Sequence, residues 1–366
     1  MKTLKLRIRD KHIDQLNRLS GSVNFVWNYV NDLSYRHLQK TGKFFSAYDL
    51  NEYTKGSGEL LGLHSQTIQA INETHAKARK QFKKAKLSWR TNNPTSKRKS
   101  LGWLPFKQSA IKHIATHQTG KKGLKSTLQL SLAKGQKLVI DLWDSYNLSL
   151  YQINTCELVQ DSRNRWYACI TVKEYPKTTC GTGSVGIDLG LKDLATCSDG
   201  VKLKAPKIYR QYEQKLGIAQ RARNKKRVKA IHAKIKNIRQ NMLHQFSHKL
   251  VNEHAAIFVG NVNAKALART KLAKSVLDAS WTTLRTMLKY KCENAGVWYE
   301  EVNEAYTTQT CSCCGSRSSS PKGRAGLGIR EWQCGECGSS WDRDVNSALN
   351  ILALGHERLA VGIPVL

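Results

Sequence analysis

Four cysteines in two close pairs constrain this chain more than any other feature of its sequence. Cys311 and Cys314 form one C-x-x-C pair, and Cys334 and Cys337 form a second pair about twenty residues later. Each pair can sit on a tight turn, with a glycine after its second cysteine, so that four thiolates surround one Zn²⁺. The segment between the pairs is too short to fold without a metal. We therefore predict a zinc ribbon over residues 306–340; the alternative is four unrelated cysteines in a loop.

The predicted zinc is structural, because four sulfur ligands leave no open coordination position for chemistry. Cys313 lies inside the first pair and could substitute for a neighbour, but its position suits the turn poorly. The other cysteines are scattered, as expected of small buried residues in a reducing cytosol.

The charge balance indicates the partner. Sixty Lys and Arg against 27 Asp and Glu leave a net charge of +33. Such an excess favours nucleic acid, because neutralising phosphates releases condensed counterions. A membrane surface is the alternative, but we find no amphipathic anchor, no run of about 18 apolar residues and no signal peptide. We expect a cytoplasmic protein with no membrane partner.

The N-terminal half combines strands with a helical insertion. Residues 1–12 alternate apolar and charged side chains, which indicates a strand, and residues 13–90 place apolar side chains at helical spacings. Residues 90–100 are polar and basic and are expected to form an exposed connection. From about 101 to 178 the alternation typical of strands returns, and it includes Leu148 and Leu150. We predict a mainly β domain, formed by 1–12 and 91–178, that carries a helical domain over 13–90.

The C-terminal half alternates strands with helices, which predicts an α/β layer structure with parallel strands. Asp188 lies near the end of a first apolar strand, and a hairpin of strands at 194–198 and 201–203 follows. Further strands are expected at 255–259 and from Val297 to Glu304. Two helices are expected, one long and basic with an apolar stripe from Ile231 to Leu250, and one over about 274–294. The Lys and Arg of the long helix favour contact with phosphates over a merely solvated face.

A short acidic motif follows the second cysteine pair. Asp342 and Asp344 open the last helix, which we expect Gly355 to end. Helix capping and compensation of the helix dipole would be enough to explain both acids.

Together these segments resemble a known family. The strand Gly186-Ile-Asp-Leu-Gly190, the stretch Tyr306-Thr-Thr-Gln-Thr-Cys311 with its ribbon, and Asp342-Arg-Asp-Val-Asn346 resemble the RuvC-type, RNase H-like nucleases, in particular transposon-encoded TnpB and its relatives, the type V CRISPR effectors. The resemblance implies a RuvC-like domain over 179–305 and 341–366, split by the ribbon. It also implies that 1–12 and 91–178 form the wedge domain and 13–90 the recognition domain, a match by layout only.

The resemblance also implies an active site. In-line cleavage of a phosphodiester uses two divalent ions, for which carboxylates are suitable ligands. By position in the motifs, Asp188 and Asp344 are the expected Mg²⁺ ligands. Most members carry a glutamate where this chain has Gly260. Either the site is inactive, or another acid has replaced that glutamate.

Glu304 is the candidate replacement, because the ends of neighbouring parallel strands share one edge of a sheet. Glu300 and Glu301 lie deeper in the strand, and the alternative role for Glu304 is a salt bridge to the ribbon. The resemblance then implies an RNA-guided, Mg²⁺-dependent DNA endonuclease encoded by an insertion sequence. Its partners would be a guide RNA from the transposon end and target double-stranded DNA, bound by a monomeric protein. The alternatives are a nuclease-dead RNA-guided repressor and a DNA-binding factor that recognises transposon ends without RNA.

Overall fold

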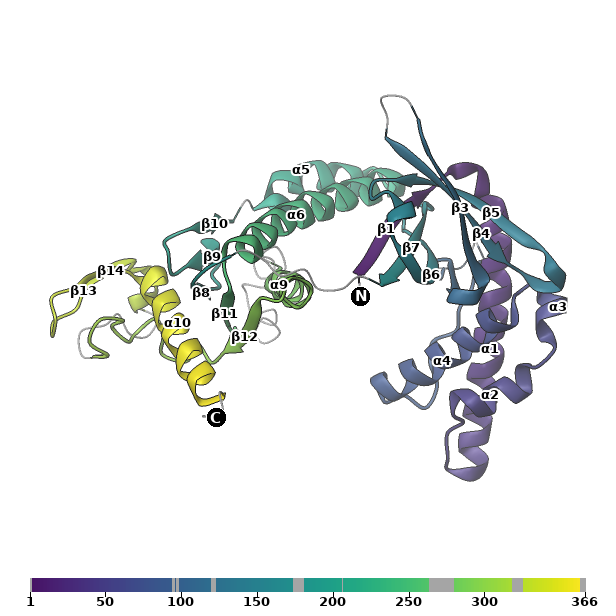
Figure 1. Cartoon of the computed structure of the whole chain (residues 1–366), viewed down its shortest axis with the longest axis horizontal. Coiled ribbons are helices and arrows are strands. Elements are labelled where there is room, and N and C mark those ends of the chain that lie inside the picture. Colours follow the sequence, from purple (N-terminus) through teal and green to yellow (C-terminus); the bar gives the residue numbers. More distant parts are fainter. Residues whose placement is uncertain are drawn as a thin grey trace. The chain divides into compact units, whose positions relative to one another are not determined.

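A computed structural model shows the fold of the chain (Figure 1). It describes residues 2–93, 96, 99–119, 123–173, 181–205, 207–262, 280–317 and 325–362. The chain divides into two compact units, Met1–Tyr175 and Pro176–Leu366. Within the described residues, every helix is too short or too polar to span a bilayer.

The first unit is built on a seven-stranded antiparallel sheet with the order β2-β6-β7-β1-β5-β4-β3. Strand β1 (Lys2–Ile8) lies near the middle and buries Leu4, Leu6 and Ile8 on one face, as the sequence alternation predicts. The other strands are β2 (Trp103–Lys107), β3 (Ile111–Gln118), β4 (Leu124–Ser131), β5 (Lys137–Asp144), β6 (Gln152–Gln160) and β7 (Trp166–Lys173). The expected strand at Leu148–Leu150 is wrong, because these residues form a 3-10 turn between β5 and β6.

Four helices follow β1: α1 (Ile13–Thr41), α2 (Ala47–Thr54), α3 (Ser57–Leu61) and α4 (Ser65–Phe82). Their apolar faces share one core with the sheet. Ser46 and Asp49 form a capping box at the start of α2, and Gly42 ends α1 in the left-handed conformation.

Two asparagines of α1 fix the chain that returns from the helices to the sheet. Asn31 accepts a hydrogen bond from the Leu87 amide and donates one to its carbonyl, at 3.0 and 2.8 Å. Asn28 does the same with Arg90, at 2.8 Å each. The side chains therefore satisfy backbone groups that have no strand partner.

The second unit contains a five-stranded sheet with the order β10-β9-β8-β11-β12. Its strands are β8 (Ser184–Asp188), β9 (Asp193–Cys197), β10 (Lys202–Lys204), β11 (Ala256–Gly260) and β12 (Trp298–Val302). Strand β11 pairs in parallel with both β8 and β12, which confirms the predicted parallel pairing. The carboxyl ends of these three strands therefore lie at one edge of the sheet.

Helices cover both faces of this sheet. On one face, α6 (Lys225–Glu253) and α9 (Trp281–Ala295) share a core with β8 and β11, and α5 (Ile208–Arg221) packs on α6. On the other face lies α10 (Arg343–Gly362), drawn in yellow in Figure 1. The predicted helix over 274–294 is present from Trp281; residues 274–279 lie outside the described part of the chain.

Helix α10 approaches the sheet closely because two glycines face the contact. A Cβ atom at Gly186 would lie 2.6 Å from the amide nitrogen of Leu352, and one at Gly355 would overlap the ring of Phe258. The expectation that Gly355 ends the helix is therefore wrong. The helix continues to Gly362, and Gly355 provides room for the aromatic ring instead of a terminus.

Candidate active site and metal centre

The four cysteines of the predicted ribbon come together on two matching turns. The amide of Gly315 donates to the carbonyl of Cys311 at 2.8 Å, and Gly338 donates to Cys334 at 2.9 Å. Both glycines have positive φ, +75° and +69°, a conformation that side chains disfavour. Strands β13 (Glu331–Gln333) and β14 (Ser340–Asp342) form the hairpin that carries the second turn.

The sulfur positions fit a tetrahedral metal. The four Sγ atoms all lie within 4.8 Å of one another, with Cys311–Cys337 and Cys314–Cys334 at 3.7 Å. Four thiolates at the usual Zn–S distance would be about 3.8 Å apart. Hydrogen bonds from the amides of Cys337 and Glu336 lower the pKa of Cys334, which favours the thiolate. Exposed Cys313 is not a member of this group.

Asp188 ends β8 at the edge of the sheet described above. Its Oδ1 accepts a hydrogen bond from the hydroxyl of Ser347 on α10 at 2.8 Å. Burial raises the pKa of Asp188 to about 7; the Ser347 hydrogen bond opposes this, and the negative charges of Asp344 and Glu304 add to it. Asp344 and Glu304 are therefore each close enough to Asp188 for their charges to act on it.

Asp342 and Asp344 have different roles at the start of α10. Asp342 Oδ1 accepts from the amides of Asp344 and Val345, both at 3.0 Å, so it caps the helix as its position predicts. Asp344 instead contacts Arg330 of the ribbon, whose Nη1 donates to both carboxylate oxygens at 2.8 and 2.6 Å. A cation therefore already lies against the Asp344 carboxylate.

Glu304 lies two residues beyond β12, so the expectation that it ends this strand is wrong. Its carboxylate nevertheless occupies the space above Gly260, the last residue of β11, because a Cβ atom built on Gly260 would overlap Glu304 Oε2. The absence of a side chain at position 260 is what admits this carboxylate.

The Glu304 carboxylate is poorly satisfied by its surroundings. Oε2 is buried and has no hydrogen-bond partner among the described residues. Burial raises the pKa of Glu304, while Arg285 and the amide of Val262 lower it. An orphaned, buried carboxylate oxygen is costly unless a cation or a proton meets it. This oxygen and the neighbouring carboxylates fit the ligand preference of Mg²⁺.

Hydroxyl groups link the segments that carry the acids. Ser347 Oγ lies 2.9 Å from Thr307 Oγ1, which is also 2.9 Å from the carbonyl oxygen of Glu304. Asn346 and Asn350, one turn apart on α10, both donate to the carbonyl of Thr310 at 2.7 Å. The last helix thus holds the turn after Glu304 in place.

The structure brings together the elements that carry Asp188, Glu304 and Asp344, but their side chains are less tightly grouped than the thiols. Among the described residues, only the four cysteines have all their ligand atoms within 4.8 Å of one another. Sequence reasoning missed Ser347 and Arg330, which contact Asp188 and Asp344. The one available signal was that Ser347 follows Asp344 by three residues, about one helical turn.

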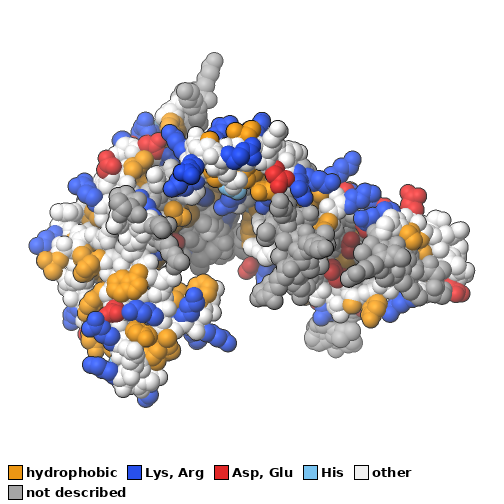
Figure 2. Space-filling model, turned by 180° about the vertical axis from the view of Figure 1, so that it is seen from behind, with side chains coloured by type: hydrophobic (Ala, Val, Ile, Leu, Met, Phe, Trp, Pro, Cys, Tyr) orange, Lys and Arg blue, Asp and Glu red, His pale blue; other side chains and the backbone are white. Residues whose placement is uncertain are grey.

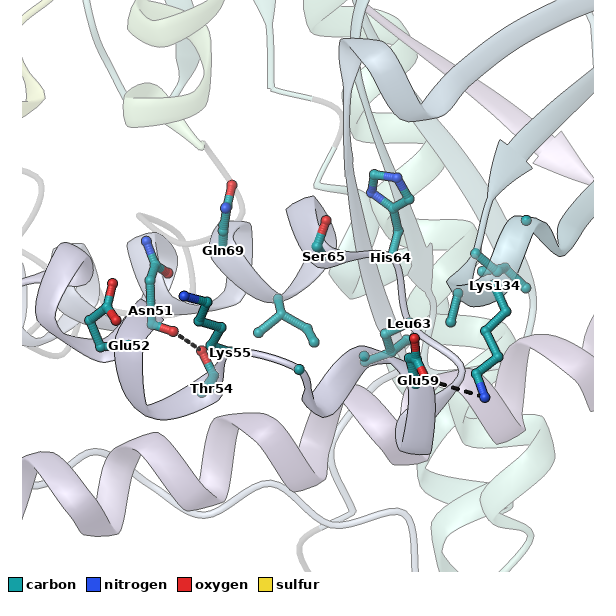
Figure 3. Close-up of a pocket in the computed structure, with 16 residues that line it drawn as sticks. Asn51, Glu52, Thr54, Lys55, Glu59, Leu63, His64, Ser65, Gln69 and Lys134 are labelled. Carbon is teal, nitrogen blue, oxygen red and sulfur yellow. Dashed lines mark hydrogen bonds and ion pairs between the residues drawn. The ribbon is translucent and has the colours of Figure 1, made fainter.

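Two other features lie on the surface of the described residues. A pocket of about 580 Å³ lies among α2, α3, α4 and the turn at 132–135 (Figure 3). Its charges have both signs, and Lys134 already pairs with Glu59 at 3.2 Å, so it carries no functional argument. On the face shown in Figure 2, Lys and Arg side chains are widespread and acidic ones are sparse, which suits a polyanionic partner.

Two family models match the chain. Residues 167–271 match OrfB_IS605, described as "Probable transposase", and residues 281–351 match the Cas12f1-like TNB domain. The second match contains both cysteine pairs and the start of α10.

Named relatives agree with these matches. The chain is 32% identical over 252 residues, 64% of its length, to a Streptomyces pristinaespiralis protein named "Putative RNA-guided DNA endonuclease". It is 30% identical over 234 residues, 56% of its length, to Escherichia coli InsQ, named in the same way. It spans 61% and 57% of those two proteins. Cas12f1 of Sulfoacidibacillus thermotolerans is 26% identical over 228 residues, 55% of this chain and 53% of that protein.

Solved structures share the fold. A Cas12f1–sgRNA–target DNA complex matches with a TM-score of 0.62 at 13% identity, over 94% of this chain and 83% of that one. The mini-RNA-guided endonuclease CRISPR-Cas_phi3 matches with a TM-score of 0.54 at 10% identity, over 100% and 93%. The chain therefore has a mixed α/β fold that resembles these Cas12-type structures, and it carries a four-cysteine cluster. In sequence, the chain is similar to InsQ, to proteins named TnpB-like and to Cas12f1.

Proposed function

We propose that this protein is an RNA-guided DNA endonuclease encoded by an insertion sequence, which hydrolyses DNA matched by a guide RNA. The observation that carries the proposal is the Glu304 carboxylate above Gly260, beside the strand end that bears Asp188. An acid has taken the place left by the missing glutamate, which favours an active site over an inactive one.

The proposed catalytic residues are Asp188, Glu304 and Asp344. Their carboxylates would hold Mg²⁺, which when bound supplies an activated water and stabilises charge on the reacting phosphate. The chain itself orients these ligands. Ser347 fixes the rotamer of Asp188, and the asparagines of α10 fix the turn that follows Glu304.

Arg330 supplies positive charge in the absence of Mg²⁺. Its Nη1 is 2.6 Å from Asp344, which offsets the repulsion between neighbouring carboxylates. If Asp344 held Mg²⁺, the Arg330 guanidinium would be available to the phosphate being cut.

The proposed domain arrangement follows the resemblance stated above. Residues 179–305 and 341–366 would form the RuvC-like nuclease domain, and 306–340 the ribbon, with Zn²⁺ on Cys311, Cys314, Cys334 and Cys337. Residues 1–12 and 91–178 would form the wedge domain and 13–90 the recognition domain. In this arrangement, base pairing by the guide RNA selects the sequence, and a single copy of the protein holds the backbones.

The test uses the full chain with RNA from its own locus. The protein should copurify with a defined RNA and cut a matching plasmid in the presence of Mg²⁺. Asp188→Ala and Glu304→Gln should abolish cutting but retain guided binding to the plasmid. Glu301→Gln, which changes a neighbouring acid of β12, is the control and should leave cutting intact.

A further variant tests whether a carboxylate at position 260 can replace the one at Glu304. The double substitution Gly260→Glu with Glu304→Ala places the carboxylate back on β11, and it should recover part of the cutting that Glu304→Ala loses. Guided binding without cutting by the natural protein would refute the nuclease and leave the guided repressor. Absence of any defined RNA would favour a factor that recognises transposon ends by itself.

A further inference from the structure

A row of cations and aromatic rings crosses the outer face of the seven-stranded sheet. Leu4 and Leu6 of β1 point into the core, so the alternate residues Lys5 and Arg7 point outward. Arg7 lies directly between Tyr167 of β7 and Trp143 of β5 in the strand register. Side chains from three adjacent strands therefore form one continuous surface.

The two rings of this row differ in how much they are covered. The Lys5 ammonium lies 4.5 Å and the Arg7 guanidinium 5.4 Å from the centroid of the Tyr167 ring. The indole of Trp143 has Arg9 over it at 5.4 Å and remains 44% exposed. Trp143 therefore has ring surface available to a ligand.

A concave site lies at the exposed indole. It has a volume of about 350 Å³ and is lined by Arg7, Ile8, Arg9, Asp10, Lys11 and Trp143. The volume is at the lower end of the roughly 300–1,000 Å³ range of small-ligand pockets. The lining of this site carries three cationic side chains and one carboxylate.

Two of the three cations are already neutralised. Arg7 pairs with Asp10 at 2.5 Å, and Lys11 pairs with Asp141 at 2.7 Å. Burial would raise the pKa of Asp141, but the hydrogen bonds from Lys11 and Thr127 outweigh it and lower the pKa to about 2, so this acid is ionised.

Arg9 differs from these two cations. Among the described residues it has no acidic partner, and its guanidinium lies beside an exposed indole. Arginine recognises phosphate with a planar fork of donors, and indole stacks on nucleobases. Together they match the two chemical parts of one nucleotide.

We propose that Arg9 and Trp143 bind an unpaired nucleotide of the guide RNA, with the base stacked on the indole and a phosphate on the guanidinium. The base must be unpaired, because bases inside a duplex are already stacked on each other. RNA is favoured over DNA because a guided nuclease holds its RNA before any target is opened. The choice of guide RNA as the ligand rests on the proposed function.

The test measures binding of a fluorescent single-stranded oligouridine RNA to the full chain, freed of copurified nucleic acid. Trp143→Ala should weaken binding about 5- to 150-fold, the loss of one stacked base. Trp143→Phe should keep most of the affinity. Arg9→Gln should lower the slope of log affinity against log salt by about 0.7, the contribution of one phosphate contact on a single strand.

Two matched controls separate this site from general effects. Trp298→Ala removes another half-exposed indole, from the second unit, and should leave RNA binding unchanged. Lys137→Gln removes a cation on the same strand and face as Trp143, six residues and about 20 Å away, and should leave the salt slope unchanged.

The inference is overturned if Trp143→Ala binds the oligouridine like the natural chain, or weakens single-stranded and duplex RNA equally. A loss for single-stranded DNA alone would assign the site to a DNA strand and also overturn it. The readout is RNA binding, which does not depend on cutting. If Trp143→Ala binds RNA unchanged while the natural chain shows guided cleavage, only this site is rejected and the proposed function stands. No RNA binding by the natural chain would reject the guided function itself.

Discussion

A methyl group added at Gly260 would enter the space that the Glu304 carboxylate now occupies. The new Cβ atom would overlap Glu304 Oε2 and lie 3.2 Å from Ile351 Cδ1 and 3.3 Å from Glu304 Cβ. Ile351 can yield by a few tenths of an ångström, but the carboxylate must turn away. Gly260→Ala is therefore expected to displace a proposed metal ligand without removing any polar group.

The expected cost follows from the contact. Overpacking of a buried site costs about 1–3 kcal/mol, and we expect about 1 kcal/mol here because the atom that must move is the end of the flexible Glu304 side chain. Glu304→Ala removes that partner together with an unsatisfied buried oxygen, so without Mg²⁺ it should cost little or be stabilising. In the Glu304→Ala background, Gly260→Ala should then cost less than about 0.5 kcal/mol. The two substitutions should therefore couple by about 0.5–1 kcal/mol.

Hydrogen exchange of β11 and α10 amides measures this cycle in the full chain, with zinc kept and Mg²⁺ omitted. Local exchange is preferable to global unfolding because a two-unit chain need not unfold in one step. If Gly260→Ala lowers protection equally in both backgrounds, the clash is with Ile351 and the argument about Glu304 is wrong. Cleavage by Gly260→Ala should fall as far as cleavage by Glu304→Ala.

Three further predictions concern other parts of the chain. Cys334→Ser should abolish bound zinc and expose the ribbon to protease, whereas Cys313→Ser should keep the zinc, as measured by metal content. Burial lowers the pKa of His75 to about 4, so the unfolded chain takes up a proton first as pH falls below about 6.5. The contact between α1 and α4 should therefore lose stability as pH falls from 6.5 to 4, by about 2 kcal/mol at pH 5. Hydrogen exchange of the amides in these helices measures the loss, and His75→Gln should remove its dependence on pH. Asn31→Leu leaves the Leu87 amide and carbonyl without partners, and should raise exchange at 87–90 by an amount equivalent to about 2 kcal/mol or more.

Local sequence patterns predicted much of the fold correctly. The alternation of β1 identified its buried face, and the two C-x-x-C pairs with their following glycines identified the turns of the ribbon. The position of Asp342 before α10 identified the helix cap. Each of these depends on residues close together in the chain, where period and spacing decide the geometry.

The errors arose where distant segments meet. Gly355 has the sequence signature of a helix end, yet it lies within α10 because the ring of Phe258 packs against it. Leu148–Leu150 alternates like a strand, but the connection between β5 and β6 turns there. The roles of Ser347 and Arg330 were not predictable, because their partners lie 159 and 14 residues away.

The sequence by itself determined the four-cysteine ribbon, the positive charge and the alternation of strands with helices in the second unit, because these follow from residue type and spacing. Only the tertiary structure decided where Glu304 lies. Parallel pairing of β11 with β12 and the missing side chain at Gly260 leave a space that its carboxylate fills. Such a space is defined by atoms from three separate elements, β11, α10 and the turn after β12, so no single stretch of sequence encodes it.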